Sequence, residues 1–183
     1  LQYYLLAPSL LGGSEEKARQ QAAEIRARSA YRGAFAFAQI AQKRKDWPTV
    51  AREMDALTRQ YPDSMAPWIG LGNALGQQRR WDEAWAAADR MLAAMDGAPG
   101  AQYVVGRLAA ESGTRLERGE AALLKYLQHA PSRGEPSLAA AHWRLGAVRE
   151  QQGRRDQARA EYEAALKLDP KLKAAREALE RLR

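Results

Sequence analysis

The chain has 183 residues, of which 46% are apolar, and this length and composition suit one folded domain with a hydrophobic core. It contains no cysteine, which excludes disulfides, thiolate zinc sites and cysteine nucleophiles and fits the cytoplasm and the periplasm equally well. The net charge of +7 favours acidic partners, and no apolar run is long enough to predict a transmembrane helix.

The first predicted helix follows the apolar N-terminal stretch LQYYLLAPSLLGG. Ser14 is a candidate N-cap, and Glu15 and Glu16 in the first turn complement the helix dipole. We expect residues 1–30 to form an irregular, partial helix pair, in which residues 1–6 end the first helix and APSLLGG forms a long loop. The first residue is Leu1 rather than Met, so the sequence leaves open a removed signal peptide or a further N-terminal repeat.

Residues 70–76, GLGNALG, match the loose form of a dinucleotide-binding loop. Such a loop needs a preceding β-strand that aims the glycines at a pyrophosphate. The preceding residues, YPDSMAPWI, instead predict a turn, with Ser64 as N-cap, and then a helix. The glycines therefore lie inside a helix, where each costs about 0.5 to 1 kcal/mol relative to alanine, and a packing reason is required.

An internal repeat supplies that reason. Pairs of a large and a small residue end at steps of 34, 34 and 40 residues, at Ala38, Gly72, Gly106 and Gly146. A second small or β-branched residue follows each pair, at Val50, Ala84, Gly119 and Ala158. Prolines close three of the units, at Pro62, Pro131 and Pro170. A period of about 34 residues is typical of the tetratricopeptide repeat.

The last unit carries the clearest resemblance to the tetratricopeptide repeat family. Residues 142–170 keep the family's Leu-Gly pair, a loop glycine and the later small, aromatic and proline positions, at Leu145, Gly146, Gly153, Ala158, Tyr162, Ala165 and Pro170. The resemblance extends over about residues 31–172 and implies an all-α fold, a right-handed superhelical solenoid of antiparallel helix pairs. Gly72 is then a packing glycine within a pair, whereas Gly70 and Gly76 are expected at surface or groove positions.

We expect one solenoid domain over residues 1–183. It would contain a partial repeat at 1–30, repeats at about 31–64, 65–98, 99–133 and 139–172, and a capping helix at 171–183. The expected helix pairs are 31–44 with 47–60, 65–78 with 81–95, 99–112 with 116–129, and 137–151 with 155–168. SRGEPS, residues 132–137, is predicted to bulge as a loop. The capping helix has an apolar stripe, which keeps the end of a solenoid soluble, at Leu172, Ala175, Leu179 and Leu182.

The resemblance also implies a function, that of a non-enzymatic scaffold or adaptor whose concave groove binds a protein or peptide partner. The groove positions, on the first helix of each pair, fall on Arg32, Phe35, Gln39, Ile69, Asn73, Tyr103, Arg107, Trp143 and Arg144. The apolar residues could anchor side chains of a partner, and the arginines could pair a carboxylate or an extended backbone. Helical spacing leaves open whether the aromatic residues are core residues instead.

A carboxylate clamp of the kind known in the family is not expected. Its lysine and asparagine positions in the first unit hold Phe35 and Gln39, and the next asparagine position holds Gly70. The N-terminal stretch also resembles an irregular repeat of exported bacterial proteins, which favours a bacterial protein and the periplasm over the cytoplasm.

Basic residues cluster near the turns within the helix pairs and would form a ridge if the turns stack along one edge. These residues are Lys43, Arg44, Lys45, Arg79, Arg80, Arg115, Arg154 and Arg155. Two alternatives to a groove-binding scaffold follow. The ridge could bind nucleic acid or an anionic membrane surface, although no RNA-binding motif accompanies it. The chain could also be a structural module that associates with itself.

Catalysis, metal binding and a cofactor are not expected. The only histidines are His129, expected at the end of a second helix, and His142, at a repeat position that usually packs, and no partner constellation accompanies either. Tryptophans recur near the starts of second helices and are interpreted as packing between helices, at Trp47, Trp81 and Trp85. No spacing of residues predicts a metal site.

Overall fold

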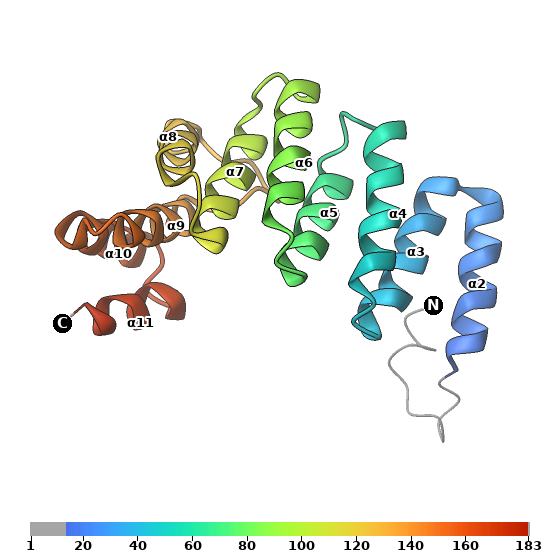
Figure 1. Cartoon of the computed structure of the whole chain (residues 1–183). Helices are drawn as coiled ribbons and strands as arrows, with labels where there is room; N and C mark the ends of the chain where they lie inside the picture. The colour runs from blue at the N-terminus through green and yellow to red at the C-terminus, as the bar shows by residue number, and fades with distance from the viewer. Residues whose placement is uncertain (1–13, 183) are drawn as a thin grey trace. The chain divides into compact units, whose positions relative to one another are not determined.

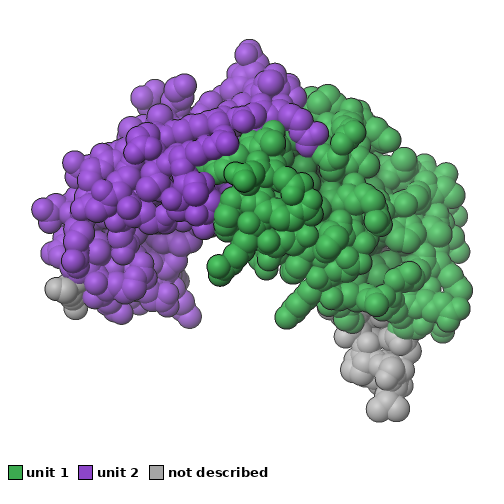
Figure 2. All heavy atoms as spheres, in the orientation of Figure 1, with its two compact units in different colours: residues 1–87 green, residues 88–183 purple. Residues whose placement is uncertain are grey.

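The computed structural model describes residues 14–182, in which all regular structure is helical and no residue lies in a β-strand (Figure 1). The chain divides into two compact units, residues 1–87 and 88–183, which are coloured separately in Figure 2. The helix end and loop predicted within residues 1–13 lie outside the described residues.

Unit 1 contains helices α2 to α5 and the start of α6. The bounds are Glu15–Arg28 for α2, Ala30–Lys43 for α3, Trp47–Gln60 for α4, Met65–Gln77 for α5 and Trp81–Ala94 for α6. Consecutive helices pack on one another, α2 on α3, α3 on α4 and α4 on α5. These bounds agree with the predicted helix pairs.

Unit 2 contains the end of α6 and helices α7 to α11. The bounds are Pro99–Ser112 for α7, Leu116–Tyr126 for α8, Leu138–Gln151 for α9, Arg155–Leu168 for α10 and Lys173–Arg181 for α11. Helix α9 packs on α7, α8 and α10, and α11 packs on α10. The predicted loop at 132–137 is present. The sequence predicts that His129 ends α8, and this prediction is wrong. The helix stops at Tyr126, and the ring of His129 lies 3.0 Å from Glu135 in the loop.

Polar side chains begin several helices, as the sequence predicts. The Ser14 hydroxyl accepts a hydrogen bond from the Lys17 backbone N–H at 3.3 Å, which satisfies one of the unpaired donors of α2. Ser64 occupies the N-cap position of α5 but makes no capping bond. Its hydroxyl lies 2.9 Å from the Tyr31 hydroxyl, so this side chain links the start of α5 to α3 instead.

The turn within each helix pair carries at least one residue in the left-handed region of backbone conformation. These residues are Lys45 with φ 57°, Arg79 with φ 54°, Gly113 with φ 70° and Gly153 with φ 78°, and the turn after α7 has a second one, Arg115 with φ 49°. A left-handed backbone costs residues other than glycine roughly 1 to 2 kcal/mol. The turns therefore place strain on three of the residues assigned to the basic ridge, Lys45, Arg79 and Arg115.

Glycines bring the paired helices of unit 2 into close contact, as the sequence predicts. A Cβ atom added at Gly146 in α9 would lie 2.5 Å from the ring of Tyr162 in α10. One added at Gly106 in α7 would lie 2.2 Å from Leu123 in α8. Neither contact leaves room for a larger residue, because carbon atoms pack at about 3.5 to 4.0 Å.

Gly70 differs from the expectation of a surface or groove position. A Cβ added there would lie 2.7 Å from the sulfur of Met54, a buried side chain of α4. The glycine is therefore needed because α4 and α5 approach each other at this point. Gly76 has more space, since an added Cβ would lie 3.4 Å from the Trp81 ring. The packing role of Gly72 stays a prediction.

The C-terminal helix covers the apolar side of α10. Ala178 and Leu182 of α11 form one buried cluster with Ala158 and Tyr162 of α10. Leu179 packs against the same cluster, and Ala175 is fully buried. The stripe predicted from the sequence is thus the side of α11 that covers the last helix pair.

Candidate functional site

In unit 1, a single residue joins α2 to α3 and caps both helices. Ser29 is both the C-cap of α2 and the N-cap of α3: its N–H donates to the Ile25 carbonyl at 2.8 Å and its hydroxyl accepts from the Arg32 N–H at 3.3 Å. Gly33 allows the close approach, since a Cβ there would lie 2.3 Å from the Arg26 backbone. The two helices therefore meet tightly and form one wall of a cavity.

That cavity is an apolar pocket of about 690 Å³, open to solvent. Its volume lies in the range of about 300 to 1,000 Å³ that is typical of ligand sites. The lining comes from the end of α2, from α3 and from the start of α5, at Ile25, Arg28, Ser29, Tyr31, Arg32, Phe35, Ala36, Gln39 and Ala66. All three groove residues predicted on α3, Arg32, Phe35 and Gln39, are among them.

An aromatic cluster holds one side of the pocket. The rings of Tyr31 and Phe35, one helical turn apart, have centroids separated by 5.1 Å, and Tyr31 contacts Tyr61 edge-on at 5.0 Å. The Tyr31 hydroxyl is already engaged by Ser64. Phe35 is half-buried in the free chain, so it is neither a core residue nor a fully exposed one.

Two arginines of the pocket have no counter-charge. Among residues 14–182, no hydrogen bond or ion pair engages the guanidinium of Arg28 or Arg32, and both residues are exposed. The neighbouring Arg26 contrasts with them, because it pairs with Glu53 at 2.6 Å and lies over the Phe37 ring at 4.1 Å. The family positions counted from Tyr31 cannot include residues of α2, so the sequence interpretation missed Ile25 and Arg28.

The other groove residues predicted in unit 1 lie further along α5. Ile69 is exposed to 36% of its surface, which is unusual for a large aliphatic side chain, and Asn73 is also exposed. They are not among the residues that line the pocket. A partner that extends past the pocket along α5 would find an apolar contact there and an amide that has no hydrogen-bond partner within residues 14–182.

The groove residues predicted in unit 2 have more intramolecular contacts. Tyr103 is half-buried against Tyr126, with ring centroids 5.2 Å apart. Trp143 is half-buried against the cluster beneath α11. Among the described residues, Arg107 makes no hydrogen bond or ion pair and is half-buried. Part of each aromatic ring thus stabilises the fold, so changing these residues would also affect folding.

Arg144 is not an unpaired charge at the edge of a groove, because the fold already supplies it with partners. Its guanidinium lies 3.1 Å from the Glu111 carboxylate of α7 and 4.1 Å above the Trp143 ring. Its Nε atom is buried without a hydrogen-bond partner. The sequence could not identify this pairing, since Glu111 belongs to the preceding repeat.

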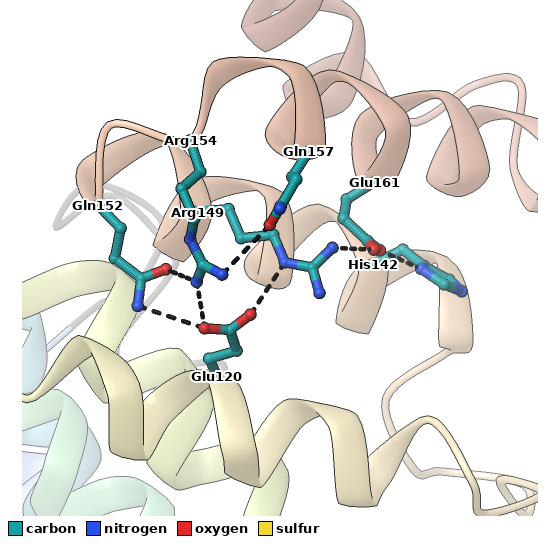
Figure 3. Close-up of polar contacts among 7 residues, drawn as sticks. All are labelled: Glu120, His142, Arg149, Gln152, Arg154, Gln157 and Glu161. Atoms are coloured by element: carbon teal, nitrogen blue, oxygen red, sulfur yellow. Dashed lines mark hydrogen bonds and ion pairs between the residues drawn. The ribbon is translucent and has the colours of Figure 1, made fainter.

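A half-buried ion network joins α8, α9 and α10 in unit 2. Figure 3 shows its members, Glu120, His142, Arg149, Gln152, Arg154, Gln157 and Glu161. Arg149 bridges two carboxylates, Glu120 at 3.1 Å and Glu161 at 2.7 Å, and all three side chains are only 15 to 16% exposed. His142 Nδ1 lies 2.6 Å from Glu161, and Arg154 also pairs with Glu120.

The pKa of Glu120 shows that the hydrogen bonds of this network outweigh the cost of burying its carboxylate. Burial raises the pKa of Glu120, but the hydrogen bonds from Arg154 and Arg149 outweigh it and leave the pKa below its ordinary value. His142 takes part in the network through Glu161, and the network holds three helices together. Among the described residues, no group of acidic or histidine side chains could hold a metal ion.

The residues of the predicted basic ridge are divided between paired and unpaired charges. Four of them bind acidic side chains nearby: Arg44 pairs with Glu15, Arg80 with Glu83, Arg115 with Asp89, and Arg154 with Glu120. Four have no ion pair within residues 14–182, namely Lys43, Lys45, Arg79 and Arg155. The positive charge available at the turns is therefore about half of what the sequence suggests.

The fold is that of a tandem array of helix pairs, and comparison with known proteins identifies the class. Residues 139–172 match the family model of the tetratricopeptide repeat. The whole fold is similar to the crystal structure of a thermophilic tetratricopeptide repeat protein of Thermus thermophilus. That likeness has a TM-score of 0.66 and 15% sequence identity and covers 92% of this chain and 98% of that one.

Residues 139–172 therefore carry a tetratricopeptide repeat, and the fold of the chain is that of a tetratricopeptide repeat solenoid. A comparison of the sequence with curated proteins finds no match. Proteins with this repeat generally act as non-enzymatic scaffolds that bind other proteins. Within residues 14–182, every helix is too short or too polar to traverse a bilayer.

Proposed function

We propose that this protein is a non-enzymatic scaffold that binds a protein or peptide partner through its A helices, the first helices of the pairs. The observation that carries the proposal is the pocket of unit 1, where Arg32, Phe35 and Gln39 of the A helix α3 line an apolar cavity. Aromatic and arginine side chains are the residues that most often dominate the energy of an interface. Ile69 and Asn73 of α5, the next A helix, extend the binding surface beyond the pocket.

In unit 2, taken by itself, the corresponding A-helix residues are Tyr103 and Arg107 of α7 and Trp143 of α9, and we propose them as a binding surface of that unit. Arg107 is the charged residue there that has no partner among the described residues. Arg144 contributes less than the sequence suggests, because its charge is already paired with Glu111. We therefore expect Arg107→Ala to weaken partner binding and Arg144→Ala mainly to lower stability.

Site-specific photo-crosslinking tests the proposal and separates it from the two alternatives. A photoreactive residue is placed at Ile69 on the A helix α5 or at Arg79 in the turn after it, and the protein is irradiated in extract of its source organism. The proposal predicts discrete protein adducts from position 69 and few from position 79. Both positions are exposed, so the comparison is matched for accessibility.

Each alternative gives a different pattern. Adducts to nucleic acid or lipid from position 79, lost as salt is raised, would support binding through the basic ridge and contradict the proposal. Adducts of twice the mass of the chain would indicate self-association. Equal protein adducts from both positions would show that the A helices are not a specific surface.

A further inference from the structure

We infer that the pocket of unit 1 binds the C-terminal residue of a partner polypeptide, with an apolar side chain in the cavity and the α-carboxylate paired with Arg28 and Arg32. This inference rests on the proposed function and specifies its ligand. It differs from the clamp known in the family, because the residues involved lie at the junction of α2 and α3.

The cavity selects an apolar group. Ile25, Phe35, Ala36 and Ala66 provide apolar lining from three helices. The one tyrosine hydroxyl among the lining residues, that of Tyr31, is already bonded to Ser64. Burying a polar side chain without a hydrogen-bond partner is unfavourable, so an aliphatic or aromatic side chain fits best.

The charge at the pocket selects an anion. Arg28 and Arg32 both line the cavity, and no acidic residue does so among the described residues. Neither guanidinium has an ion pair or hydrogen bond within residues 14–182. Guanidinium groups bind carboxylates through charge-assisted hydrogen bonds, which are stronger than bonds between neutral groups. An apolar cavity with two unpaired guanidiniums is complementary to an apolar group that carries a carboxylate.

A chain terminus supplies both groups from one residue, because its side chain and its α-carboxylate leave the same Cα atom. An internal aspartate or glutamate would require a neighbouring residue for the apolar contact, and the backbone would have to continue past the lining. Few polar groups of the pocket could satisfy that backbone, because the Ser29 hydroxyl already accepts from the Arg32 N–H and can offer only its own O–H as a donor. The Gln39 amide, which has no partner among the described residues, is available for a single peptide group.

The test uses fluorescein-labelled glycine–serine peptides that end in leucine, with fluorescence polarisation as the readout. Four forms are compared: the free acid, the C-terminal amide, the free acid with glycine in place of leucine, and the amide with an aspartate before the leucine. The free acid with leucine should bind to the full chain, and amidation or loss of leucine should each weaken binding about tenfold or more.

Variants locate the site. The double substitution Arg28→Gln with Arg32→Gln should abolish the difference in affinity between the free acid and the amide. The control, Lys43→Gln with Lys45→Gln, removes the same charge from the same unit and should leave that difference in affinity intact. Equal binding of acid and amide, equal loss in both double variants, or no saturable binding up to about 1 mM would overturn the inference. So would tighter binding of the internal aspartate peptide than of the free acid. Persistence of crosslinks from position 69 would then leave the proposed function standing.

Discussion

Replacing Gly146 by alanine tests the helix packing that defines the repeat. An added Cβ would lie 2.5 and 2.6 Å from two carbon atoms of the Tyr162 ring. The ring has little freedom to move away, since Tyr162 is fully buried and its hydroxyl donates to Glu150 at 2.6 Å. Because carbon contacts are normally about 3.5 to 4.0 Å, α9 and α10 must separate by roughly 1 Å, or the ring must tilt.

The expected loss of stability follows from two opposing effects. Overpacking of a core costs about 1 to 3 kcal/mol, whereas alanine in a helix interior is favoured over glycine by about 0.5 to 1 kcal/mol. We expect Gly146→Ala to lower the free energy of unfolding by about 0.5 to 2 kcal/mol. At about 2 to 4 °C per kcal/mol, the melting temperature should fall by about 1 to 8 °C.

Gly76→Ala is the matched control, because its Cβ would lie 3.4 Å from the Trp81 ring, an ordinary contact. This variant should gain most of the helix preference and melt about 1 to 4 °C higher than the wild type. Thermal unfolding followed by circular dichroism measures both. If the two units melt separately, each variant should shift only the transition of its own unit. A Gly146→Ala protein at least as stable as the wild type would refute the packing argument.

Four further substitutions test other parts of the structure. Arg79→Gly should raise stability by about 0.5 to 1 kcal/mol in thermal unfolding, because glycine relieves the left-handed backbone; a loss would contradict that conformation. Arg149→Met should cost about 1 to 3 kcal/mol in urea unfolding, since it removes the guanidinium that bridges two half-buried carboxylates and leaves Glu120 to Arg154 and Gln152 and Glu161 to His142, and a neutral result would show that the bridge is dispensable. Ala178→Asp should detach α11 and cause concentration-dependent association in light scattering, and a stable monomer would show that α11 is an appendage. The Ser132 backbone N–H holds the pKa of Glu135 down to about 2, so the order of the loop should be retained above pH 4 and lost toward pH 2 in amide exchange. Glu135→Gln should remove that pH dependence, and a loop that loosens equally in both proteins would count against it.

Much of the fold could be predicted from the sequence because its cause is local or periodic. Gly146 and Gly106 recur at the repeat spacing, and both contact the second helix of their pair as predicted. Ser14 begins α2 as predicted, since an N-cap depends only on the next few residues. The all-α fold class with paired helices is confirmed for the same reason.

Contacts between distant residues could not be predicted in this way. Gly70 requires space because of Met54, a residue of the preceding helix that the repeat pattern does not mark. The pairing of Arg144 with Glu111 depends on how successive repeats meet. Only the part of the pocket lining that lies on α3 could be predicted. The family positions include Arg32 but not Arg28, which belongs to the irregular N-terminal region.

The affinity of a crosslinked partner for Ile69→Ser and for Arg79→Gln tests the central claim most directly. Both side chains are exposed, so neither change should alter the fold, and melting curves verify this. If the A helices form the binding surface, the first substitution should raise Kd about tenfold or more, as expected for an apolar interface contact, and the second should leave it unchanged. The reverse ranking, together with a steep fall of affinity with salt, would place the partner on the basic turns and contradict the account.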